Sequence, residues 1–127
     1  MNLWITAASG LSALTLGAHI IGGGKEVHLP MLGSPLSPLL KGYASVLWHM
    51  VTVVLLTDTI VLILTLAGRN TEGLLLLILM QSIGFAALFV WYGLRRHNNI
   101  TTMPQWIAFV GIAGLIAGGL NRNGAML

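Results

Sequence analysis

Cysteine is absent from the 127 residues, and charged residues make up only 7% of them. Without thiols the chain has no disulfides, thiolate metal sites, iron–sulfur clusters or thiol catalysis. A soluble domain carries about 25% charged residues, because water must wet its surface. The composition therefore excludes a mostly water-exposed surface, and a lipid bilayer is the solvent that fits.

Acidic residues and the signatures of common enzymes are also scarce. Three acidic residues leave few carboxylate pairs for acid–base catalysis. The sequence has no Walker loop, no G-x-S-x-G elbow and no H-E-x-x-H motif. Its six basic residues are scattered between apolar runs and form no patch for nucleic acid. We expect a non-enzymatic protein that has the bilayer, and no nucleic acid, as a partner.

Long apolar runs dominate what is present, with a mean hydropathy of +0.88. A helix needs about 20 mostly apolar residues to cross the hydrocarbon core. Four segments meet or approach this length, at residues 2–21, 43–67, 73–94 and 104–120. The pattern predicts an all-α integral membrane protein, folded as a single four-helix antiparallel bundle.

The connections between these spans differ in character. Residues 68–72 are a tight polar turn, and residues 95–103 form a short loop before Pro104. Residues 22–42 open with three glycines and contain three prolines, yet remain apolar. This composition predicts an interfacial linker, in which Ser37 caps the second helix and Pro38 is its first residue.

Basic residues indicate the orientation in the membrane. Lys25, Lys41, Arg95 and Arg96 fall on the side of linkers 22–42 and 95–103, against two arginines on the side of the N-terminus. The positive-inside rule then places both linkers in the cytoplasm. The tryptophans and tyrosines are typical of interfacial belts, and all but Trp4 lie near the same side: Tyr43, Trp48, Trp91, Tyr92 and Trp106.

All four histidines fall on this predicted cytoplasmic side. At about 100° per residue, a small and polar stripe on the first helix ends at His19, and a stripe on the second helix includes His49. Polar stripes in lipid face protein, so we expect His19 and His49 to meet, with Glu26 and His28 folded over them. Two interpretations remain open. One is a site for a transition metal on His19, Glu26, His28 and His49, or for haem on His19 and His49; the other is a set of structural or interfacial histidines.

Asp58 is the remaining polar candidate, because it lies near the middle of the second span. An ionised carboxylate there costs a few kcal/mol unless it is paired, protonated or hydrated. Gln81 lies at a matching depth on the third helix, so we expect Asp58 and Gln81 to form an intramembrane polar pair. The alternative role for Asp58 is a proton or cation relay.

Glycines mark one face of the fourth span. Gly111, Gly114 and Gly118 allow close helix packing, and Gly114 with Gly118 forms a GxxxG pair. The partner is either the first helix or another subunit.

Three further stretches are residues 19–28 (HIIGGGKEVH), Trp48-His49 and residues 103–106 (MPQW). Together they resemble a group of small four-span bacterial membrane proteins of unassigned function. The resemblance covers most of the chain and implies the bacterial inner membrane, but no binding residues. The length is also similar to small multidrug exporters and fluoride channels, although the exporters' glutamate in the first helix and any fluoride-channel motif are missing.

Three functional hypotheses follow. The first is a binding or accessory subunit with a His/Glu ligand site at one membrane face, docked through the glycine face of the fourth helix onto a larger membrane complex. The second is a metal- or haem-binding redox or homeostasis protein that uses the same site. The third is a small homo-oligomeric transporter or channel that depends on Asp58.

Overall fold

The chain is all-helical over the residues that the computed structural model describes, 2–124. Four long helices account for most of it: α1 (Leu3–Ala18), α3 (Pro38–Leu66), α4 (Glu72–His97) and α5 (Trp106–Gly124). Between α1 and α3 lie a π-helix, η1 (His19–His28), and a short helix, α2 (Leu29–Gly33). A 3-10 turn, η2 (Ile100–Thr102), precedes α5. The predicted all-α class is confirmed.

The first helical segment is longer than the sequence pattern predicted. It runs without a break from Leu3 to Gly33, so most of the predicted linker 22–42 is helical and only residues 34–37 connect it to α3. Glycine and proline favour helix ends, but apolar surroundings require backbone groups to find partners within the segment itself. The predicted cap is present, because the Ser37 hydroxyl accepts from the Leu40 N–H and Pro38 is the first residue of α3.

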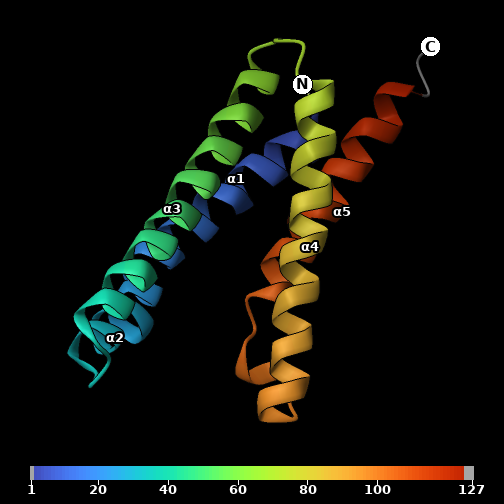
Figure 1. Ribbon diagram of the computed structural model, residues 1–127. Coiled ribbons are helices and arrows are strands. Elements are labelled where there is room, and N and C mark those ends of the chain that lie inside the picture. The colour runs from blue at the N-terminus through green and yellow to red at the C-terminus, as the bar shows by residue number, and fades with distance from the viewer. Residues whose placement is uncertain (1, 125–127) are drawn as a thin grey trace.

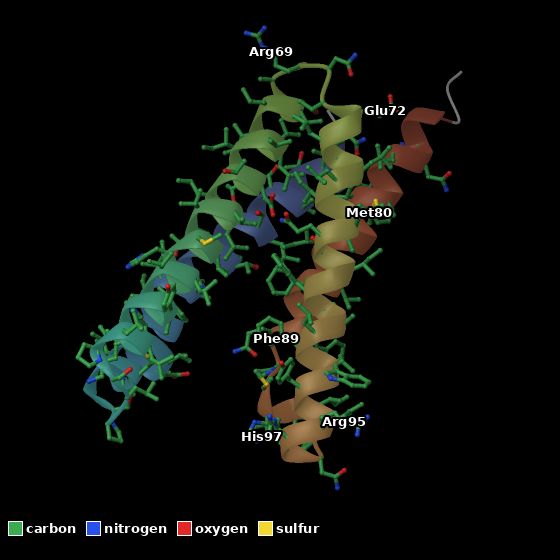
Figure 2. All side chains as sticks on the ribbon, in the orientation of Figure 1. Arg69, Glu72, Met80, Phe89, Arg95 and His97 are labelled. Atoms are coloured by element: carbon green, nitrogen blue, oxygen red, sulfur yellow. The ribbon has the colours of Figure 1, made fainter. Side chains whose placement is uncertain are left out.

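The four long helices run antiparallel and form two pairs, α1 with α3 and α4 with α5 (Figure 1). Both termini lie at the end that holds the α3–α4 turn, and the two pairs diverge toward the opposite end. Arg69 and Glu72 mark the first end, whereas Arg95 and His97 mark the second (Figure 2). We call the second end, which also holds η1 and α2, the basic end.

The apolar core lies where the two pairs converge. Every long helix contributes to it, and Ile5, Leu62, Leu75 and Ile116 are its most deeply buried large side chains. A second cluster lies nearer the basic end, around Leu55, Ala86 and Phe109. Beyond it neither η1 nor α2 has a buried residue. The core thus joins the pairs at one end and leaves the basic end of the α1–α3 pair unsupported by α4 and α5.

Glycines bring α5 close to α1. An added Cβ would lie 2.9 Å from Leu11 at Gly111, 2.8 Å from Trp4 at Gly118 and 2.5 Å from Ile5 at Gly119. Gly114 has open space instead. Close packing on the first helix therefore uses Gly111 and Gly118, one heptad apart, together with Gly119, and not the predicted GxxxG pair. Gly111, Gly118 and Gly119 therefore face α1 within the molecule, whereas Gly114 does not.

Three helical segments are long and apolar enough to cross a membrane: Leu3–Gly33, Pro38–Leu66 and Glu72–His97. The fourth apolar helix, Trp106–Arg122, is shorter. Many large apolar side chains on the outer faces are exposed, which a lipid environment would cover.

Candidate functional site

Side-chain hydrogen bonds join α1 and η1 to α3 at three levels, from Ser12 to His28. The Ser12 and Thr59 hydroxyls lie 2.8 Å apart in the buried interior. Farther toward the basic end, His19 Nε2 lies 3.0 Å from Thr52 Oγ1, and His28 Nε2 lies 3.0 Å from Ser45 Oγ. The two polar stripes therefore do face each other, as the sequence predicted for His19.

The spacing of these contacts explains the π-helix. On α3 the partners Thr59, Thr52 and Ser45 are seven residues apart, two turns or about 10.5 Å of α-helix. The step from Ser12 to His19 also takes seven residues, but the step from His19 to His28 takes nine. In an α-helix nine residues amount to about 900°, which would put His28 on the face opposite His19. The wider i→i+5 winding of η1 returns His28 to the face of His19 within the same distance along α3.

Trp48 fills the space between the two histidines. Its ring stacks on His19 with centroids 4.1 Å apart and on His28 with centroids 5.3 Å apart, and both pairs are near parallel. His19 Nε2 also lies 3.4 Å from the Trp48 carbonyl oxygen. We call His19, Trp48, His28 and His49 the tryptophan–imidazole cluster.

Gly23 makes room for the indole. A Cβ on Gly23 would lie 2.8 Å from Trp48 Cη2, whereas Gly22 and Gly24 have open space. Because the indole is held between two imidazoles, it has little freedom to move aside. Of the three consecutive glycines, Gly23 is thus the one that the packing requires.

His49 lies at the margin of the cluster and not at its centre. Its ring meets the edge of His28, with centroids 5.4 Å apart. The sequence predicted that His49 would contact His19, and this contact is not formed. Within the part of the chain that the structure describes, the His49 ring makes no hydrogen bond. The α3 face toward η1 carries Ser45, Trp48 and Thr52, which turns the neighbouring His49 toward the exterior.

The four predicted metal ligands do not converge. The indole separates His19 from His28, and Glu26 is exposed without a hydrogen bond or ion pair to any described residue. Among residues 2–124, no group of three or more His, Asp or Glu side chains has the arrangement of a metal site. His97 is exposed at the end of α4, away from the cluster. The arrangement does not fit one ion held by His19, Glu26, His28 and His49.

The predicted polar pair is present. Gln81 Nε2 donates to Asp58 Oδ2 at 2.6 Å, and both residues are half-buried. This contact joins α3 to α4, from the two pairs that diverge toward the basic end. Asp58 therefore has a partner in the interior, and that partner also ties the two helix pairs together.

Sequence reasoning missed Trp48 and Gly23 as members of this region. Trp48 was assigned to an interfacial aromatic belt, because a tryptophan near the end of a span is typical of one. A heptad reading of Ser45, Thr52 and Thr59 would have placed Trp48 between the first two, on the face toward the first helix. Comparison with protein-family models, curated proteins and solved structures finds no match to this chain.

Proposed function

We propose that this chain is a small polytopic membrane protein of the bacterial inner membrane, a non-enzymatic binding subunit whose site is the tryptophan–imidazole cluster. The single observation that carries the proposal is the Trp48 ring stacked between His19 and His28 on a ten-residue π-helix. π-helical turns are rare and occur frequently at functional sites. The glycines of η1 are poor helix formers, and the segment is wound as a π-helix beside three imidazoles. A structural role alone would not require this combination.

The ligand that this site suits is amphiphilic and enters from the bilayer. The polar groups lie near the basic end, at the level expected for headgroups, and apolar side chains surround them. We place the basic end at the cytoplasmic face of the membrane. The positive-inside rule favours this orientation, because that end carries Lys25, Lys41, Arg95 and Arg96. In the accessory version, the protein presents this ligand site to a larger membrane complex by a face other than the glycines of α5.

Mass spectrometry of the purified protein tests the proposal. The wild-type protein in mild detergent should retain one amphiphile in stoichiometric amount, and a variant with His28→Ala and His49→Ala should lose it while keeping its helical content. A wild-type sample without any bound amphiphile would contradict the proposal. A Soret band or stoichiometric zinc or copper would replace it with the metal or haem alternative.

The bond between Asp58 and Gln81 favours a second candidate, a small oligomeric transporter or channel. A carboxylate at this depth is costly and often belongs to an ion pathway. It also joins the two helix pairs, so a change in its protonation would act where they separate. Flux measurements in liposomes decide this: Asp58→Asn should abolish proton- or cation-coupled transport. Transport at full rate in this variant would reject the coupling role.

A further inference from the structure

A depression open to the exterior lies beside the tryptophan–imidazole cluster, between η1 and α3. Its volume of about 390 Å³ falls within the range of roughly 300–1,000 Å³ common for ligand pockets. It is lined by Ile20, Ile21, Gly24, Lys25, His28, Leu29, Trp48, His49 and Thr52. We call it the η1 depression.

The charged and titratable groups of the η1 depression are all of one kind. Lys25 contributes a positive charge, His28 and His49 contribute imidazoles, and no carboxylate lines the depression. Lys25 is exposed and forms no ion pair with any described residue. A site built in this way attracts an anion and has no built-in counterion to displace.

Hydrogen-bond donors are available in the same place. Where Ser45 donates to Nε2 of a neutral His28, the proton of that ring resides on Nδ1 and can be donated to a ligand. The His49 ring, which has no hydrogen bond to any described residue, adds a second imidazole. Together with the Lys25 ammonium, they match the several acceptor oxygens of a phosphate group.

Most of the remaining wall is apolar. The depression is lined by the exposed side chains of Ile20, Ile21 and Leu29, which no other part of the described chain covers. A small anion dissolved in water gains nothing from these side chains, whereas the acyl chain of a lipid packs against them. Basic pockets on the cytoplasmic side of membrane helices are known to bind anionic headgroups.

We propose that the η1 depression binds one anionic phospholipid, with its phosphate at Lys25, His28 and His49 and an acyl chain along Ile20, Ile21 and Leu29. This inference rests on the proposed function, since it names the chemical class of the amphiphile. The lipid would wedge against η1 and cover the segment that α4 and α5 leave unsupported.

Native mass spectrometry with lipids of matched acyl chains tests the inference. The protein should retain phosphatidylglycerol one to one and in preference to phosphatidylcholine, and inorganic phosphate should not displace it. Lys25→Gln should weaken retention roughly fivefold, since a lysine near the surface contributes about 1 kcal/mol to the binding of anionic lipid. Lys41→Gln is the matched control, because Lys41 lies on the same basic end but outside the depression; it should leave retention unchanged.

The outcomes separate the two proposals. Equal retention of both lipids, or equal weakening by Lys25→Gln and Lys41→Gln, would overturn the anionic-lipid inference while a bound amphiphile still supports the proposed function. Displacement by inorganic phosphate would identify a simple anion site and would also overturn it. A wild-type protein that retains no amphiphile of any kind would overturn both. Thermal unfolding of each variant shows whether the fold is intact.

Discussion

The two ends of the molecule solve the same packing problem differently. At the end with both termini, four α-helices bury an apolar core around Ile5, Leu62, Leu75 and Ile116, and α5 approaches α1 over glycines. At the basic end only α3 faces the first helical segment, and the contact consists of stacked rings and hydrogen bonds. The first end has the apolar packing of a stable scaffold, whereas the second has polar contacts and an open depression beside them.

The difference also shows in the winding of the chain. The apolar end keeps α-helical periodicity, so its contacts repeat every seven residues, as Gly111 and Gly118 do. At the basic end the chain departs from α-helical periodicity between His19 and His28, where π-helical winding places two imidazoles on one face. Departures from regular periodicity concentrate where function needs a particular arrangement.

The largest effect is expected in the scaffold core. Ile116→Ala removes a fully buried side chain and should lower the free energy of unfolding in detergent by about 2–5 kcal/mol, because it leaves a cavity. Ile107→Ala, at a 58% exposed position of the same helix, should lower it far less. Equal losses would mean that α5 does not bury Ile116.

Close packing of α5 on α1 gives the next effect. Gly119→Ala places a Cβ against the fully buried Ile5 and should cost about 1–3 kcal/mol of unfolding free energy, through overpacking. Gly114→Ala has open space and should be neutral or stabilising by up to about 1 kcal/mol, because alanine is the better helix former. Chemical denaturation of both variants measures the contrast, and the reverse order would contradict this packing.

At the basic end, a glycine substitution should act on the site more than on the scaffold. Gly23→Ala forces the Trp48 ring out of its stack and should change the near-ultraviolet circular dichroism of tryptophan and weaken lipid retention. Global stability should fall by no more than about 1 kcal/mol, since the apolar core is untouched. Gly22→Ala is the matched control with open space. Identical spectra for the two variants would argue against the stack.

The smallest effect is expected at the junction of the two helix pairs. Asp58→Asn keeps the size and an acceptor oxygen for Gln81, so the unfolding free energy should change by less than about 1 kcal/mol. Asp58→Leu removes the bond and leaves Gln81 without this partner, which should cost more. Thermal unfolding in detergent compares the two, and equal stability would show that the bond does not tie α3 to α4.

Much of the scaffold could be predicted from hydropathy and depth. The apolar runs indicated the four helices, Ser37 and Pro38 indicated the start of α3, and matching depth paired Asp58 with Gln81. The end of the first segment could not be predicted. Three glycines and Pro30 are typical helix breakers, yet the backbone remains helical through all of them.

The site was predicted only in part. His19 was placed correctly on the face toward α3, because Ser12 and His19 keep the heptad spacing of their partners. Regular periodicity assigned His49 to the interface with the first helix and Trp48 to a lipid-facing belt. In the structure the residue at this interface is Trp48, one position before His49. His28 reaches the cluster through π winding, which no α-helical periodicity indicates.

The central claim is that η1 places His19 and His28 on the two faces of one indole. Fluorine NMR of protein labelled with 5-fluorotryptophan tests it most directly, with the Trp48 resonance assigned from Trp48→Phe. Both His19→Ala and His28→Ala should shift that resonance, and His97→Ala should leave it in place. A Trp48 resonance that responds to His19→Ala but not to His28→Ala would mean that the segment is an ordinary α-helix, and would contradict the account.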